Sequence, residues 1–158
     1  MKTITALALR EQINGKKILV DTNIIIYLTD AIQPYEQLSR VLFEMVEHGD
    51  VSAVFSIITI AEVMQGPTKK GRHRIAQDVK NYLLNFPNTH CQEITTDVLE
   101  HIGRDKRIDW AKLRIVDSLV IASGLEGEAD LFISNDDQFR RAVSPDLVLS
   151  FRSPEVKN

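Results

Sequence analysis

The sequence predicts a single α/β domain with a central, mostly parallel sheet. Short apolar segments that suit buried strands alternate along the chain with segments in which apolar residues recur at helical spacing. The strand candidates are almost continuously apolar, as expected where helices cover both faces of a parallel sheet. No repeat, low-complexity tract or linker breaks this order, and 158 residues are enough for one domain with its own core.

Strands are predicted where β-branched and other apolar residues follow one another. These segments are residues 17–20, 51–58, 91–94, 130–134 and 147–149. Helices are predicted where apolar residues recur on one side, with Pro34 suited to a first helical position and Gly49 to a helix end. They are expected at residues 23–28, 34–48, 59–65, 72–86, 95–102 and 113–124, with one more after Asp137.

Two further expectations concern the helices. The pair Gly66-Pro67 is expected to stop the helix that begins near Thr59. The buried sides of the next two helices are predicted from the spacing of their apolar residues. These residues are Ile75, Val79, Tyr82, Leu83 and Phe86 in one helix, and Val98, Leu99 and Ile102 in the other.

The chain is expected to divide into a leader at residues 1–16, the domain at 17–152 and a polar tail at 153–158. The leader is interpreted as a short helix or a flexible segment that ends at the turn signal Asn14-Gly15, and the tail is expected to fray. No segment reaches the length of a signal peptide core or of a membrane span. With a single cysteine, Cys91, the sequence predicts a soluble cytoplasmic protein without a disulfide framework.

Asp21 is the first candidate for chemistry. It follows the first predicted strand directly, and ligands of open α/β sheets bind at the carboxyl ends of strands. A cap for the helix that starts near Asn23 explains the same residue equally well. Three further carboxylates at comparable junctions, Glu62, Asp117 and Asp136, favour the chemical interpretation.

Glu62 and Asp117 each have a structural alternative. Glu62 stands three residues after Thr59, which fits a capping box as well as a ligand at a strand-to-helix junction. Asp117 shares a helical face with apolar residues, where an unpaired charge would cost several kcal/mol. An ion pair with Arg114, three residues earlier, could compensate this charge and would make Asp117 a structural residue. A bound divalent cation could also compensate it and would make Asp117 a functional residue, which is the interpretation that we favour.

Asp136 and Asp137 follow the fourth predicted strand and compete for one role. If Phe132 and Ser134 share one face of that strand, the chain leaves the sheet at Asn135, and the first acid after it stays close to the neighbouring strand ends. Asp136 is therefore the predicted site residue. Asp137 is expected in the first helical turn, where the helix dipole favours a carboxylate.

The formal net charge of −3 argues against a nucleic-acid binder that relies on overall positive charge. It does not exclude a nuclease, because a site that gathers carboxylates for a metal contributes negative charge of its own. A local basic run could meet a nucleic-acid backbone, or could be a solvated loop and helix start. Its candidate substrate-binding residues are Lys69, Lys70, Arg72 and Arg74.

With these residues placed, the chain resembles the PIN-domain family of metal-dependent nucleases, from about residue 17 to residue 149. By this resemblance the four acids take the places of the family's site acids, and Thr22, Asn23 and Ser134 match the polar residues that support them. The specificity of the match lies in the ordered set rather than in any one motif. The resemblance implies a three-layer α/β/α fold and an endoribonuclease that leaves a 5′-phosphate and a 3′-hydroxyl.

Oxygen ligands without His or Cys suit Mg²⁺ or Mn²⁺, which could activate water and stabilise the departing oxygen. Proteins of this size in the family are most often the toxins of VapBC toxin-antitoxin pairs, which implies a small antitoxin as partner and a homodimer. We expect the antitoxin in a groove between the early helices, with apolar Tyr27, Leu28 and Ile32 at an interface. An RNA-processing nuclease outside such a pair, an aspartyl phosphotransfer protein and a silent binding module remain alternatives.

Overall fold

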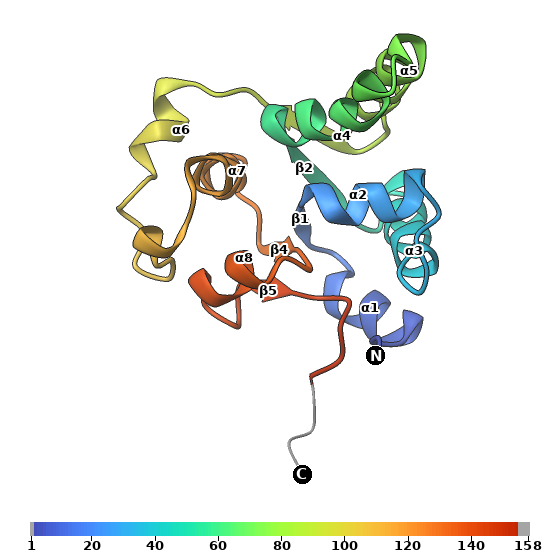
Figure 1. The fold of residues 1–158 in the computed structure, drawn as a ribbon. Helices are drawn as coiled ribbons and strands as arrows, with labels where there is room; N and C mark the ends of the chain where they lie inside the picture. Colours follow the sequence, from blue (N-terminus) through green and yellow to red (C-terminus); the bar gives the residue numbers. More distant parts are fainter. Residues whose placement is uncertain (1, 155–158) are drawn as a thin grey trace.

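A computed structural model describes residues 2–154 as a five-stranded parallel sheet between two layers of helices (Figure 1). The strand order is β3-β2-β1-β4-β5. The strands are β1 (Lys17–Val20), β2 (Ser52–Ser56), β3 (Thr89–Gln92), β4 (Leu131–Ile133) and β5 (Val148–Leu149). The chain runs outward from β1 to β3 and then returns to β4 on the other side of β1. The order therefore reverses between β1 and β4, where α/β sheets bind ligands.

The helices follow the predicted order. They are α1 (Ala6–Ile13), α2 (Thr22–Thr29), α3 (Glu36–Glu47), α4 (Ile57–Lys69), α5 (His73–Leu84), α6 (Thr96–Glu100), α7 (Ile115–Glu126) and α8 (Asp137–Ala142), with a short 3-10 helix η1 (Trp110–Lys112). Apart from α4, helices and strands begin and end within two residues of expectation. Among the described residues no helix is long and apolar enough to cross a membrane. Residues 155–158 of the expected tail lie outside the described residues.

Alternating side chains of the strands form two cores, one on each face of the sheet. Ile18 and Val20 of β1 face the core shared with α1, α2 and α3, whereas Leu19 faces the core shared with α7. β4 repeats the pattern, because Phe132 lies in the α7 core while Leu131 and Ile133 lie in the other. Figure 1 shows α7 on one side of the sheet and α2 and α3 on the other. The predicted three-layer α/β/α class is confirmed.

The start and the end of α4 correct two predictions. The helix begins at Ile57 rather than near Thr59, because Ser56 caps it and accepts a hydrogen bond from the Ile58 N–H at 3.3 Å. It also continues past Gly66 to Lys69 with Pro67 inside it. The missing N–H of proline costs one hydrogen bond near the helix end, where its own carbonyl accepts from Lys70 at 3.1 Å. The capping box of Thr59 and Glu62 does not form, because Thr59 lies inside the helix with its hydroxyl buried and without a hydrogen-bond partner among the described residues.

The predicted buried sides of α5 and α6 are partly wrong. Ile75 is 45% exposed, Tyr82 is 50% exposed and Leu99 is 49% exposed, whereas Ala76 and Leu83 are buried. Apolar spacing predicts which residues share a face, but the neighbouring elements decide how far around the helix the covered strip extends.

The leader contains a packed helix. Leu9 and Ile13 of α1 are fully buried in the core beside α3. The segment before α1 pairs with the end of the chain, because the Ile4 N–H donates to the Phe151 carbonyl at 2.9 Å. The two ends of the described chain therefore lie side by side.

Candidate active site

Asp21 lies at the carboxyl end of β1, and three donors hold its carboxylate. Ser134 Oγ donates to Oδ2 at 2.6 Å, and Asn23 Nδ2 donates to the same oxygen at 3.1 Å. The Thr22 N–H donates to Oδ1 at 2.8 Å, so Asp21 also caps α2 as the structural alternative proposed. The residue is only 8% exposed. Its carboxylate is therefore fixed in orientation at the place where the strand order reverses.

Burial raises the pKa of Asp21 from its ordinary value of 3.8 to about 6, although the hydrogen bonds from Ser134 and Thr22 lower it. The nearby carboxylates of Glu62 and Asp136 raise the pKa further. Because these acids repel one another, a cation placed among them would be stabilised.

Glu62 is connected to Asp21 through the intervening threonine. It lies on the exposed side of α4, and its Oε1 accepts a hydrogen bond from Thr22 Oγ1 at 2.8 Å. Thr22 therefore joins the carboxylates of β1 and α4, one through its backbone N–H and the other through its hydroxyl.

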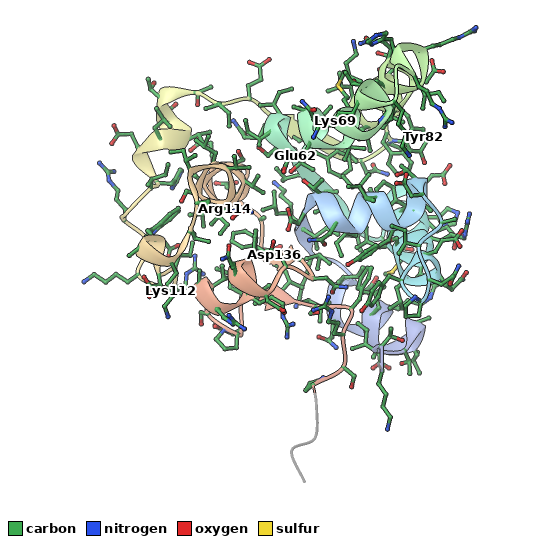
Figure 2. All side chains as sticks on the ribbon, in the orientation of Figure 1. Glu62, Lys69, Tyr82, Lys112, Arg114 and Asp136 are labelled. Atoms are coloured by element: carbon green, nitrogen blue, oxygen red, sulfur yellow. The ribbon has the colours of Figure 1, made fainter. Side chains whose placement is uncertain are left out.

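Asp136 stands at the start of α8, beside the hydroxyl that holds Asp21. Its N–H donates to Ser134 Oγ at 3.1 Å, and its Oδ1 caps the helix by accepting from the N–H groups of Gln138 and Phe139 at 2.8 and 3.1 Å. Figure 2 shows Asp136 and Glu62 on different sides of the same central region of the molecule.

Among the described residues, the carboxylate of Asp137 pairs with two arginines and not with the residues around Asp21. It is the first residue of α8, and its Oδ1 pairs with Arg140 at 3.4 Å and with Arg152 at 3.2 Å. The structure thus separates the two acids as the strand geometry predicted, with Asp136 near Asp21 and Asp137 in the first helical turn.

Asp117 reaches the same edge of the sheet from α7. Gly127 at the end of this helix packs on Val54 within β2, whereas Ser123 Oγ lies 2.9 Å from Ser56 Oγ at the carboxyl end of β2. The helix therefore runs antiparallel to the strands, and its earlier residues extend past their carboxyl ends. This places Asp117, in the first turn, at the edge where Asp21 lies.

The partner of Asp117 in the structure is Arg114. The arginine Nε lies 3.3 Å from Asp117 Oδ2, and the two side chains are 71% and 14% exposed. The ion pair that would compensate the charge of Asp117 without a metal is thus present, and its arginine is largely exposed to solvent.

Comparison with known proteins identifies the family. The sequence matches the family model of the PIN domain over residues 18–144. The chain belongs to the PIN domain family. No curated protein matches it by sequence.

Solved structures of toxin-antitoxin proteins share the fold of this PIN domain. VapBC-1 from nontypeable Haemophilus influenzae superposes with a TM-score of 0.61 at 19% identity, over 85% of this chain and 98% of the other. VapBC2 from Rickettsia felis, bound to a DNA fragment from its promoter, gives 0.60 at 16% identity with the same coverage. Mycobacterium tuberculosis VapC20, a sarcin-ricin loop cleaving toxin, gives 0.57 at 17% identity over 78% and 93%. At these identities the likeness shows the fold.

The acids of this PIN domain fit a divalent cation by their chemistry, since all four offer carboxylate oxygens. As the side chains stand, no three His, Cys, Asp or Glu residues in the described part of the chain form a group that could hold a metal ion. Three of these acids have partners within the chain. Glu62 is held by Thr22, Asp117 by Arg114, and Asp136 by the first turn of α8. A cation that binds the Asp117 oxygen paired with Arg114 would displace the arginine.

The predicted substrate-binding residues lie along α4 and the start of α5, and all four are exposed. Lys69 is seven residues, or about two turns, beyond Glu62 on α4, so the two share one side of that helix. Figure 2 shows both of them on this helix. Lys70, Arg72 and Arg74 lie farther along the chain, and the structure gives none of them a bond to a site acid.

Asn135 is a site residue that the sequence did not single out. It is 3% exposed, its N–H donates to Asn23 Oδ1 at 3.2 Å, and its Oδ1 accepts from Ser150 Oγ and the Phe151 N–H, each at 2.8 Å. Its amide donates to Tyr27 Oη at 3.1 Å. Asn135 therefore connects two parts of the structure to the loop in which it and Ser134 lie. These parts are α2 and the end of the chain. An amide directly after an apolar strand was the available signal.

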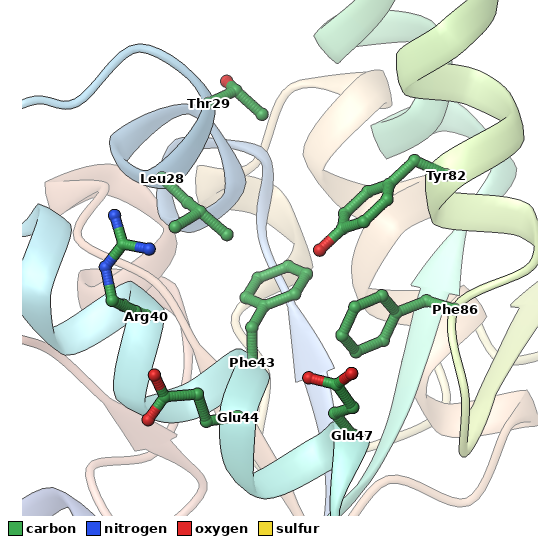
Figure 3. Close-up of a pocket in the computed structure, with 8 residues that line it drawn as sticks. All are labelled: Leu28, Thr29, Arg40, Phe43, Glu44, Glu47, Tyr82 and Phe86. Atoms are coloured by element: carbon green, nitrogen blue, oxygen red, sulfur yellow. The ribbon is translucent and has the colours of Figure 1, made fainter.

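A pocket of about 440 Å³ lies away from the acids, between α2, α3 and α5 (Figure 3). We call it the helix pocket. Its lining residues are Leu28, Thr29, Arg40, Phe43, Glu44, Glu47, Tyr82 and Phe86. Because none of them is a site residue, the helix pocket offers a second surface that is separate from the acids.

Proposed function

We propose that the protein is a metal-dependent ribonuclease that hydrolyses phosphodiester bonds within RNA. The observation that carries the proposal is the buried carboxylate of Asp21, which Ser134 and Asn23 hold while Glu62 and Asp136 lie near enough to raise its pKa. Membership of the PIN domain family and the shared fold with VapC toxins support this activity.

The proposed site holds one or two Mg²⁺ or Mn²⁺ ions through four acids. These acids are Asp21, Glu62, Asp117 and Asp136. When bound, the metal supplies Lewis acidity toward the attacking water and the departing oxygen of the phosphodiester. Ser134 and Asn23 keep the carboxylate of Asp21 in one orientation, and the hydroxyl of Thr22 positions that of Glu62. We expect a 5′-phosphate and a 3′-hydroxyl as the new ends.

The RNA backbone is proposed to approach along α4. Lys69 shares one side of this helix with Glu62, so a strand that passes the acids would meet its ammonium group. Lys70, Arg72 and Arg74 extend this positive surface beyond the end of the helix. Positive side chains are needed there because the acids themselves repel phosphate.

A small antitoxin is the proposed protein partner, with the helix pocket as its docking place. Phe43, Tyr82 and Phe86 give the pocket aromatic walls, and Glu44 and Glu47 favour a basic residue next to the inserted apolar one. The similar structures from Rickettsia felis and Haemophilus influenzae are VapBC proteins. We expect the toxin and its antitoxin in the cytoplasm.

A homodimer is also proposed, although of Tyr27, Leu28 and Ile32 the first is already engaged within its own chain. Tyr27 has partners within its own chain, because it stacks on Tyr35 with ring centroids 4.6 Å apart and accepts a bond from Asn135. Leu28 lines the helix pocket, and Ile32 is 38% exposed. Light scattering that finds only monomer at micromolar concentration would count against the dimer.

The decisive experiment is cleavage of a mixed RNA pool by purified protein with Mn²⁺, and again with EDTA. We expect cleavage with the metal and none without it. Asp21→Asn and Asp117→Asn should each abolish cleavage and leave the protein folded, since each replaces a proposed metal-binding carboxylate by an amide of the same shape. Wild-type rates in either variant would overturn the site, and a folded protein that binds RNA without cutting it would point to a binding module.

A further inference from the structure

Neither helix capping nor the helix dipole explains why an arginine stands at position 114. It is the N-cap residue of α7, yet its side chain makes no capping hydrogen bond. A cation at this end of a helix is disfavoured by the helix dipole, which favours anions there. The one ionic contact of the guanidinium in the described structure is with Asp117, and with the arginine 71% exposed such a pair stabilises a fold very little.

Of the two side chains, Asp117 depends more on this contact, because it is the more buried of the pair. Its side chain is 14% exposed and stands in the first turn of α7, the end of the helix that extends past the carboxyl ends of the strands. Arg114 therefore supplies positive charge to one site acid from a side chain that remains free to move into solvent. The weakness of the pair makes it easy to exchange for a cation that binds Asp117 more tightly.

We propose that Arg114 is an exchangeable partner, which neutralises Asp117 in the metal-free protein and moves to a phosphate of the RNA when a divalent cation takes its place. This inference rests on the proposed function. Guanidinium binds phosphate oxygens in bidentate fashion, and the N–H groups at the start of α7 favour an anion in the same place. Figure 2 shows Arg114 at α7, to one side of both Glu62 and Asp136.

The chain offers a matched control for this residue. Arg104 is 73% exposed and pairs with Glu100 at 2.7 Å, so Arg104→Gln removes the same charge and a comparable ion pair. Glu100 is not one of the site acids, and Arg104 has no role in the proposed site. Comparing Arg114→Gln with Arg104→Gln therefore separates the exchange from a general loss of positive charge.

The first measurement is calorimetric titration of the RNA-free proteins with Mn²⁺. Because Arg114 competes with the metal for Asp117, Arg114→Gln should bind Mn²⁺ about two- to fivefold more tightly, the range that an exposed ion pair supports. Arg114→Lys should stay near the wild-type affinity, since it keeps a positive charge, and Arg104→Gln should equal wild type. Unchanged or weaker Mn²⁺ binding by Arg114→Gln would overturn the exchange, as would wild-type protein that binds no Mn²⁺.

The second measurement is single-turnover cleavage of RNA at saturating Mn²⁺. Arg114→Gln should be slower by at least about tenfold, the order of loss when a donor to a reacting phosphate is removed, and Arg104→Gln should match wild type. An unchanged rate in Arg114→Gln would overturn the phosphate contact. If wild-type protein cleaves no RNA, the proposed function fails, while the Mn²⁺ titration still decides whether Arg114 and the metal compete.

Discussion

Replacing Asp21 by asparagine should make the metal-free protein more stable at neutral pH. The pKa of Asp21 rises from 3.8 to about 6 on folding, because burial and two neighbouring acids disfavour its charge. Once both the folded and the unfolded states are ionised, such a shift costs about 3 kcal/mol of folding free energy. The residue is 8% exposed, so solvent screening reduces this figure little.

The increase in the free energy of unfolding that Asp21→Asn gives should be smaller than the free-energy cost of burying the charge. The carboxylate of Asp21 accepts from Ser134 and Asn23 at Oδ2 and from the Thr22 N–H at Oδ1, whereas an asparagine amide has one oxygen and can accept at only one of these two positions. One mispaired donor costs about 1–2 kcal/mol. We therefore expect Asp21→Asn to raise the free energy of unfolding by about 1–2 kcal/mol at pH 7.5 in EDTA.

The pH dependence carries the sharper test. Because the folded-state pKa is raised, the unfolded chain loses its proton first, and wild-type stability falls as pH rises from about 4 to about 6. At pH 4, the lower end of this window, the folded state is protonated and the unfolded chain is only partly ionised, so most of the advantage of Asp21→Asn should be lost. Urea unfolding at pH 7.5 and pH 4 measures both values. Asp137→Asn is the control and should show no gain in stability at either pH, because Asp137 is an exposed acid of the same region.

Two results would refute this reasoning. Equal or lower stability of Asp21→Asn at pH 7.5 would mean that the carboxylate is not strained by burial. A gain of the same size at pH 4 would mean that the substitution acts through packing rather than through charge. Added Mn²⁺ should stabilise wild type and not the variant, which tests the same carboxylate through ligand binding.

Two further predictions concern the choice of site acid and the partner surface. Asp136→Asn should lower Mn²⁺ affinity and cleavage at least about tenfold more than Asp137→Asn, because asparagine still caps α8 while one ligand oxygen is lost; equal losses would place both acids in the site. Tyr82→Ala should weaken binding of the protein encoded by the adjoining reading frame by more than about tenfold, whereas Ile75→Ala, an exposed residue of the same helix outside the helix pocket, should not. Equal effects of these two variants in a pull-down titration would reject the pocket.

The sequence by itself determined the order and type of the elements, and with them the fold class. Apolar strand segments and helical spacing are local properties, so β1 and the start of α8 could be located without knowledge of the rest of the chain. The same local rule put Asp21 and Asp136 at strand ends, and parallel strands bring such ends to one edge of the sheet. The separation of Asp136 from Asp137 also followed from strand alternation alone.

Tertiary structure decided what depends on contacts between distant residues. Ser56 caps α4 and lies against Ser123, 67 residues away, and no local pattern distinguishes this serine from Thr59 as the start of the helix. Tyr82 and Leu83 are both apolar neighbours on α5, but only packing against other elements covers Leu83 and leaves Tyr82 half exposed.

The state of the candidate site also depends on the assembled fold. The pKa of Asp21 is raised by burial that several elements create together, and its carboxylate is held by Ser134, which follows β4 and lies 113 residues away in the sequence. Asn135 gains its role only because the end of the chain returns to offer Ser150 and Phe151. Sequence spacing names the residues that can carry charge, whereas the desolvation and the partners that tune this charge exist only once distant segments have packed.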